Sequence, residues 1–301
     1  MNKQEFYKNV VEGIKERLGN DFQIRVNEVV KVNMTLDGLT IMGKMEHIAP
    51  TIYLNDYKRQ FDSGRSLESI LEELISIYEN NRNPDILPAE NYFDFELLKD
   101  KIVIKVIGTE KNEQFLKETP HIPMENLNLA AYFYVMLSSD SEGSLGFSLK
   151  ENHLKLWNTT VAELLPLATE NTNRMYHFVI RNIEEVVSEM LTGEKKQEDN
   201  LDFFSLAMYV LTDKDRSCMG SSALFLKDKI KEFSDKCDCD VFILPSSIHE
   251  LILLNANLPD VDVSHLKDMV KEINATQVSE DEFLSDNVYY YSRKKDAISR
   301  L

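Results

Sequence analysis

The chain has 301 residues, of which 43% are hydrophobic and 28% are charged, and its formal net charge is −17. This composition is typical of a folded, soluble protein; no apolar run approaches the roughly 18 residues that span a bilayer, and the negative charge disfavours binding to nucleic acid or anionic membranes. Three cysteines, and a polar N-terminus without a signal-peptide core, predict a cytoplasmic protein with reduced thiols.

Residues 1–119 predict an N-terminal α+β region. Apolar side chains at helical spacing predict a helix over residues 3–18, and strand-like alternation follows over residues 22–34. Asp37-Gly38 is a favoured dipeptide for a two-residue turn, so we expect a hairpin turn there. A second helix has a predicted buried stripe of Leu67, Ile70, Leu71, Leu74, Ile75 and Tyr78. After a strand over 101–107, the polar segment 110–123 marks the boundary of the region.

Residues 120–301 predict a larger C-terminal α+β domain. An apolar run over 129–137, a polar turn and a second strand predict a hairpin, followed by a helix that ends near Trp157. Thr160-Val-Ala-Glu163 has the pattern of a capping box and predicts another helix start. Beyond a solvated loop expected at 192–200, we predict an antiparallel pair at 241–244 and 251–254, a helix at 263–273 and a strand at 287–291.

The predicted hairpin and helix between Tyr134 and Trp157 recur in outline between Tyr209 and Phe233. Both segments suggest a strand, a polar turn with glycine, a second strand and a helix. Two such copies would build one antiparallel sheet with helices packed on one face, although this common pattern also recurs by chance. We therefore predict an α+β fold with antiparallel sheets, helices on one face and a possible internal repeat.

The most distinctive segment places four polar side chains, Ser246, Ser247, His249 and Glu250, between two apolar runs. A serine, a histidine and a carboxylate are the parts of a nucleophilic acyl-transfer site. Such parts normally converge from separate segments, and no Gly-x-Ser-x-Gly elbow is present. The favoured interpretation is therefore structural: Pro245 sets the backbone, and the polar side chains bond turn amides or cap the next strand.

Two other clusters contain metal-ligand residue types. Cys237-Asp-Cys239 could combine with Cys218 and His249, but structural zinc sites usually use Cys-x-x-Cys pairs. The motif Asp260-x-Asp262-x-x-His265 lies at a predicted helix start, where acids serve as caps. We therefore predict no metal site, and no cofactor, because a glycine-rich phosphate loop is also absent from the sequence.

Aromatic side chains are concentrated in two predicted strands, at 132–134 and 289–291. Because side chains alternate along a strand, some of these rings are expected to face away from the core. Exposed rings on a sheet suit a binding surface, and we regard Tyr132, Tyr134 and Tyr290 as candidates for contact with a protein partner.

Tyr209-Val-Leu-Thr212 and the segment Phe242-Ile-Leu-Pro-Ser-Ser-Ile-His-Glu250 resemble an uncharacterised bacterial family, catalogued only as a domain of unknown function and found mainly in Gram-positive gut bacteria of the Clostridia type. The segments 51–55 and 152–157 also fit, so the resemblance covers most of the chain. It implies a bacterial cytosolic protein, and it implies no activity, catalytic residue or cofactor.

Three functions are compatible with the sequence. The first is a non-enzymatic cytosolic interaction or regulatory protein with an unidentified protein partner, favoured by the strong core patterning and by the lack of a convergent catalytic set. The second is an acidic inhibitor that mimics nucleic acid, motivated by the net charge of −17. The third is a hydrolase that uses the turn at Ser246–Glu250. We rank them in this order and expect a protein without enzymatic activity.

Overall fold

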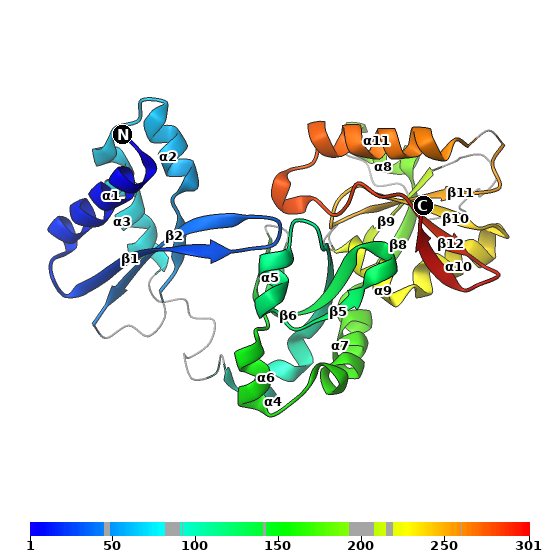
Figure 1. The fold of residues 1–301 in the computed structure, drawn as a ribbon, viewed down its shortest axis with the longest axis horizontal. Helices are drawn as coiled ribbons and strands as arrows, with labels where there is room; N and C mark the ends of the chain where they lie inside the picture. The colour runs from blue at the N-terminus through cyan, green and yellow to red at the C-terminus, as the bar shows by residue number, and fades with distance from the viewer. Residues whose placement is uncertain are drawn as a thin grey trace. The chain divides into compact units, whose positions relative to one another are not determined.

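The computed structural model describes residues 1–44, 49–81, 91, 93–140, 143–192, 208–214, 219–259 and 261–301. Contacts divide the chain into two compact units, Met1–Asp94 (unit 1) and Phe95–Leu301 (unit 2). All three sheets are antiparallel and helices accompany them, which confirms the α+β class (Figure 1). Unit 2 begins earlier than the boundary expected at residues 119 and 120, because β4 (Ile102–Gly108) pairs with β6 (Leu129–Asp140).

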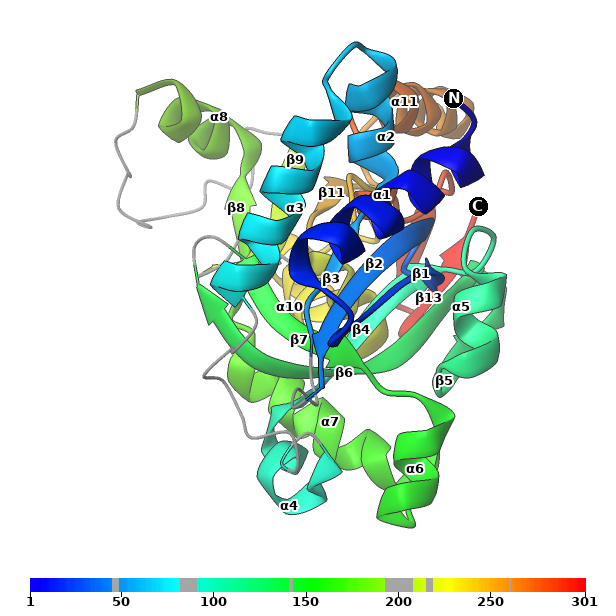
Figure 2. The same cartoon turned by 90° about the vertical axis from the view of Figure 1, so that its left-hand side faces the viewer.

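Unit 1 is a three-stranded sheet with helices on one face. Its elements are α1 (Lys3–Leu18), β1 (Phe22–Val30), β2 (Thr35–Gly43), β3 (Thr51–Tyr53), α2 (Asn55–Asp62) and α3 (Leu67–Asn81). The strands lie in the order β1-β2-β3, and Figure 2 shows α1, α2 and α3 on the same side of them. Helices and strands share one core: Phe6, Val10, Ile14, Leu39, Ile41, Ile52, Leu54, Ile70, Leu71, Leu74 and Tyr78. The predicted helices α1 and α3 are confirmed, whereas α2 was not predicted.

The β1–β2 hairpin turns at residues 31–34, so the turn expected at Asp37-Gly38 was wrong. Asn33 has a φ of 64° in this turn, a left-handed conformation that asparagine tolerates better than most residues. Gly38 lies inside β2, where a Cβ would come within 2.5 Å of Thr51 Cγ2. The glycine therefore permits close packing between strands instead of forming a turn.

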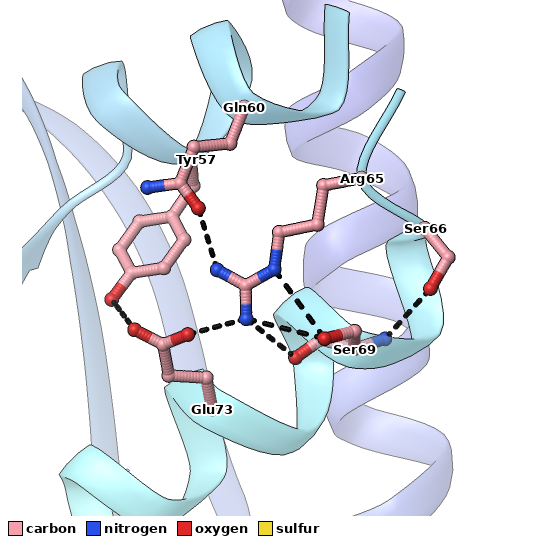
Figure 3. Close-up of polar contacts among 6 residues, drawn as sticks. All are labelled: Tyr57, Gln60, Arg65, Ser66, Ser69 and Glu73. Carbon is pink, nitrogen blue, oxygen red and sulfur yellow. Dashed lines mark hydrogen bonds and ion pairs between the residues drawn. The ribbon is translucent and has the colours of Figure 1, made fainter. Parts of the chain in front are cut away.

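A polar network fixes α2 against α3 (Figure 3). The Arg65 guanidinium donates to Gln60 Oε1 at 2.5 Å, to Ser69 Oγ at 3.2 Å and to Glu73. The second Glu73 oxygen accepts from the Tyr57 hydroxyl at 2.9 Å. The bonds from Arg65 and Tyr57 lower the pKa of the Glu73 carboxyl, while burial and then the Glu73 bond raise the pKa of Tyr57 to about 12. The network positions α2, which has no fully buried residue of its own.

Unit 2 contains two sheets, and the first is arranged around the long strand β6. One side of β6 pairs with β4, and the other side pairs with β5 and then β7. The further elements of this part are α4 (Phe95–Leu98), α5 (Glu113–Glu118), β5 (His121–Met124), β7 (Gly143–Ser148), α6 (Glu151–Trp157) and α7 (Val161–Met175). The capping box of Thr160 and Glu163 starts α7, as predicted.

The second sheet of unit 2 has six strands in the order β13-β12-β10-β11-β9-β8. The elements of this part are β8 (Phe178–Asn182), α8 (Ile183–Thr192), β9 (Met208–Asp213), α9 (Ala223–Leu226), α10 (Asp228–Cys237), β10 (Val241–Pro245), β11 (Leu251–Asn255), α11 (Val263–Thr276), β12 (Tyr289–Ser292) and β13 (Ala297–Arg300). The antiparallel pairing predicted for β10 and β11 is confirmed.

Helices lie on both faces of the six-stranded sheet. Figure 1 shows α11 over one face, where its residues Leu266 and Val270 share a hydrophobic cluster with Ile252 of β11. The next residue, Leu253, points to the opposite face and pairs with Tyr209 of β9. The Tyr209 ring contacts Phe233 of α10, with 4.9 Å between the ring centroids. The expected one-faced arrangement is therefore found in unit 1 and not in this sheet, because its central strands are apolar on both faces.

The two segments of the suspected repeat differ in structure. The first forms the expected hairpin and helix from β6, β7 and α6. In the second, β9 pairs with β8 and β11, and residues 220–226 are helical, as the 3-10 helix η4 (Gly220–Ser222) followed by α9. Residues 220–226 of the second segment are thus helical where the first segment has its second strand. Residues 215–218, and the expected loop beyond Thr192, lie outside the described residues.

Side chains of α7 satisfy part of the outer edge of β4, the edge that faces away from β6. Asn171 Nδ2 donates to the carbonyl oxygen of Ile102 at 3.0 Å. The amide of Ile104 donates to Thr172 Oγ1 at 2.9 Å, and this hydroxyl donates to a carbonyl of its own helix. Both α7 residues are buried, so these bonds replace the strand partner that the edge lacks.

Two serines of η4 satisfy the next carbonyls along the same edge. Ser222 Oγ donates to the carbonyl oxygen of Ile104 at 2.9 Å, and Ser221 Oγ donates to that of Val106 at 3.1 Å. Both serines are buried. The outer edge of β4 is therefore closed by hydroxyl and amide side chains, and η4 is attached to it.

The Arg65 network leads to a first prediction. Arg65→Met removes several charge-assisted bonds, so we expect the free energy of unfolding to fall by about 1–2 kcal/mol. Arg59→Met is the matched control, because its ion pair with Asp56 is exposed on both sides and such pairs contribute about 0–1 kcal/mol. Calorimetric melting of the full chain measures both variants, and equal losses would contradict the role assigned to Arg65.

The closed edge of β4 leads to a second prediction. Thr172→Val keeps the shape of the side chain but leaves the buried amide of Ile104 without an acceptor, so stability should fall by about 1–3 kcal/mol. The control is Thr276→Val, which removes a similar bond from a threonine hydroxyl to the carbonyl four residues earlier, at an exposed site. Chemical denaturation should show a loss for the control of less than half that of Thr172→Val; similar losses would refute the assignment.

Candidate functional site

The turn at Ser246–Glu250 connects β10 to β11 and is closed by its own hydrogen bonds. The amides of Ser246 and Ser247 both donate to the carbonyl oxygen of Glu250 at 3.2 Å. The amide of His249 donates to Ser247 Oγ at 3.0 Å. This serine hydroxyl therefore accepts a bond from the turn backbone, as expected for a serine that stabilises a turn.

The backbone of the turn is also anchored from outside. The carbonyl oxygen of His249 accepts from the Gly220 amide at 2.8 Å and from Thr212 Oγ1 at 3.1 Å. The amide of Ile248 donates to the carbonyl oxygen of Glu282 at 2.8 Å. A Cβ at Gly220 would lie 2.5 Å from the His249 carbonyl oxygen. Only glycine allows η4 to approach the turn this closely.

The imidazole of His249 interacts with groups other than the serine hydroxyls. Its Nδ1 accepts from the Met219 amide at 3.4 Å, and its Nε2 lies 3.7 Å from Glu282 Oε1. Burial lowers the pKa of His249, and the charge of Glu282 partly opposes this shift. Among the described residues, no hydrogen bond joins the ring to Ser246 or Ser247. A hydrolase needs a base bonded to its nucleophile, and these contacts are instead those of a structural turn.

Two charged side chains complete the surroundings of the turn. Burial, and then the charge of Glu282, raise the pKa of the half-buried Glu250 carboxyl. Lys105 of β4 is buried, and its Nζ lies 3.5 Å from the centroid of the Tyr134 ring. Its charge also contributes to the low pKa of His249. Sequence reasoning missed Lys105, although a single lysine within an otherwise apolar strand was a visible signal.

The three candidate tyrosines do not form one surface. Tyr132 is buried, with its ring edge-on to Phe115 at 5.3 Å between centroids. Tyr134 lies on the same strand under the Lys105 ammonium. Tyr290 lies on the six-stranded sheet, where its hydroxyl donates to Asp240 Oδ2 at 2.6 Å. Each ring has contacts within unit 2, so the rings do not gather into an exposed aromatic strip.

Only some of the metal-ligand candidates lie within the described residues. Cys237 is half-buried and Cys239 is buried, and both are free thiols. Cys218 and Asp260 lie outside the described residues. In the part of the chain that the structure describes, no three histidine, cysteine or acidic side chains come together as a metal site. Within those same ranges, every helix is too short or too polar to cross a lipid bilayer.

Unit 1 contains a feature that the sequence did not indicate, an open groove of about 430 Å³ between α1 and β1. It is lined by Tyr7, Lys8, Val11, Glu12, Ile24, Arg25, Val26 and Asn27. We call it the α1–β1 groove. It depends on where a helix lies beside a strand, and residue periodicity carries no information about that placement.

The lining of the α1–β1 groove includes four consecutive residues of β1, Ile24 to Asn27. β1 pairs with β2 along its whole length and is the first strand in the sheet order, so its other edge has no strand neighbour among the described residues. A strand edge without a neighbour offers a row of backbone donors and acceptors to an incoming chain.

Asp37 fixes the first turns of α1, which form one wall of the groove. Asp37 Oδ2 accepts from the Tyr7 hydroxyl at 2.9 Å and lies 2.7 Å from Lys3 Nζ. The same oxygen accepts from Asn55 Nδ2 at 3.2 Å. Burial first, and then the bond to Asp37, raise the pKa of Tyr7. These contacts tie α1 to β2 and to the start of α2, so the groove wall is preformed.

Comparison with known proteins identifies the family of the chain. The family model described as "Family of unknown function (DUF5688)" matches residues 3–293, so the chain belongs to that family. No curated protein and no solved structure shows a significant match to the chain.

The low pKa of His249 leads to a third prediction. The unfolded chain binds a proton near the ordinary value of 6.5, whereas the folded chain binds it only at lower pH. The contribution of His249 to stability is thus fully present above pH 6.5 and is lost as the pH falls through the lowered value. His249→Asn keeps an acceptor and cannot titrate, so denaturation curves should show a weaker dependence on pH below 6.5.

Ser247→Ala is the matched control for this experiment. It removes the acceptor for the His249 amide without removing a titratable group, so it should lower stability equally at each pH. Below pH 6.5, the wild type and His249→Asn should differ in how steeply stability changes with pH. Equal slopes would contradict the neutral state of the His249 ring.

Proposed function

We propose that this member of the family of unknown function is a non-enzymatic cytosolic interaction protein, and that a protein partner binds in the α1–β1 groove of unit 1. One observation carries the proposal: the groove is lined by β1, a nine-residue strand whose outer edge has no strand neighbour among the described residues. Free strand edges recruit other chains, and proteins that do not use them usually cover them or break them with charges, proline or bulges.

The chemistry of the lining supports a peptide ligand. Val11, Ile24 and Val26 are half-buried, so a ligand that covers them removes further apolar surface from water. Lys8, Glu12 and Arg25 surround them with exposed charges. An apolar centre with a polar rim is the usual arrangement of a protein-binding surface.

The two alternatives have less support. The hydrolase proposal needs a base bonded to a serine hydroxyl, whereas His249 interacts with Met219 and Glu282. The acidic-inhibitor proposal rests on the net charge of −17 alone.

The proposal predicts that binding depends on the groove wall. Binding peptides are first selected from a random displayed library on the immobilised full chain. These peptides should bind Val11→Lys about tenfold or more weakly than the wild type, because the substitution places a charge against the apolar part of the ligand. Val187→Lys makes the same change at an exposed position on α8 of unit 2 and should leave affinity unchanged. Fluorescence anisotropy measures both, after melting curves have shown that each variant is folded.

Selected peptides that bind wild type and Val11→Lys equally well would place the interaction elsewhere and end the proposal. Failure to select any peptide would also count against it.

A further inference from the structure

We infer that the partner segment binds as an extended fourth strand beside β1, and that it alternates apolar side chains, which face α1, with acidic side chains, which face Arg25. This inference rests on the proposed function and specifies the chemistry of the partner at the same groove. Three features of unit 1 carry it: the backbone of β1, the apolar side of the groove and the charge on the opposite face.

The backbone of β1 is available on one side only. The pairing with β2 extends from Phe22 opposite Gly43 to Val30 opposite Thr35. Backbone groups of an antiparallel strand alternate between its two edges, so about half of those in β1 point away from β2. Among the described residues, none outside β2 bonds to them. Another strand satisfies such a row, and an isolated small molecule does not.

The inner side of the groove selects apolar residues. Ile24 and Val26 point to the helix-covered face and pack against the unit 1 core, and Val11 of α1 lies beside them in the groove. Residues of a fourth strand that share this face would lie next to Ile24 and Val26 at cross-strand distance. Alternate residues of the partner are therefore apolar.

The outer side of the groove selects acidic residues. Arg25 lies between Ile24 and Val26 and so points to the opposite face. Its side chain is exposed, and within the described ranges it has no ion-pair partner. Screening limits the reach of charges to about 8 Å at physiological salt, so more distant acids of the chain have little effect here. The Arg25 guanidinium therefore favours acidic residues beside it.

A second copy of β1 fits this surface less well than a partner. In an antiparallel pair of β1 strands, residues that share the face of Arg25 lie opposite one another. On β1 these are Gln23, Arg25, Asn27 and Val29, and none is acidic. Self-pairing would leave Arg25 without a counter-charge, whereas a segment with acids at alternate positions supplies one.

The experiment uses a synthetic peptide that alternates valine and aspartate, titrated calorimetrically into the full chain. Two further peptides carry the same side chains with N-methyl groups on alternate amides, in the two possible phases. Because alternate amides of a bound strand face its neighbour, one phase should lose about tenfold or more in affinity and the other should bind nearly as well as the parent. Hydrogen exchange should show new protection of amides within residues 22–30.

Arg25→Glu tests the charge. It should weaken binding of the valine–aspartate peptide by about fivefold and strengthen binding of a valine–lysine peptide. Lys15→Glu is the control, because it makes the same charge change on the exposed surface of α1 outside the groove. It should leave the ratio of the two affinities unchanged.

The outcomes separate this inference from the proposed function. Equal binding of both N-methylated phases, or no binding of the parent peptide, overturns strand addition, while groove-dependent peptides from the displayed library would still support the proposed function. Sedimentation that shows a dimer disrupted by Val11→Lys would make a second copy the occupant and overturn the inferred partner. A monomer that binds the peptide in one N-methylated phase supports the inference.

Discussion

The architecture of unit 2 depends on one requirement: the outer backbone edge of β4 is buried and must be hydrogen-bonded. Asn171 and Thr172 of α7 meet part of it, and Ser221 and Ser222 of η4 bond to two more of its carbonyls. The contact with η4 connects the first sheet to the segment that follows β9. Gly220 of the same η4 bonds the carbonyl of His249. The polar turn at Ser246–Glu250 is therefore linked to β4 through η4, whose serine hydroxyls bond to β4 and whose Gly220 amide bonds to the turn.

The two units treat strand edges in opposite ways. In unit 2, polar side chains bond to the carbonyls of Ile102, Ile104 and Val106 and to the amide of Ile104, so these groups are not available to a further strand. In unit 1, no described side chain outside the β1–β2 hairpin bonds to the outer edge of β1, and a groove lies between β1 and α1. An unpaired backbone group costs free energy. In unit 2 side chains of the same unit remove this cost, whereas in unit 1 a strand from another chain can remove it.

The sequence predicted features that depend on neighbours along the chain. The helix over residues 3–18, the capping box at Thr160 and the antiparallel pairing of β10 with β11 all follow from local periodicity or capping. Features set by contacts between segments far apart in the sequence were not predictable. Asp37-Gly38 looked like a turn because of its dipeptide. The real reason for the glycine is its close contact with Thr51 of another strand, which the local sequence does not reveal. The residues around Gly220 looked like a hairpin, but their serines bond to β4 and favour a helical turn. The α1–β1 groove and the role of Arg25 depend on packing alone.

The closure of β4 also affects how unit 2 is assembled during synthesis. Ser222 follows its acceptor Ile104 by 118 residues, and Thr172 follows it by 68. A nascent chain therefore contains β4 and β6 long before it contains η4, and contacts of such long sequence separation form slowly. Over that interval, an apolar strand has part of its edge uncovered, a state in which chains associate with one another. The order of elements along the chain thus gives unit 2 a vulnerable period on the ribosome, which ends when η4 emerges and bonds to β4.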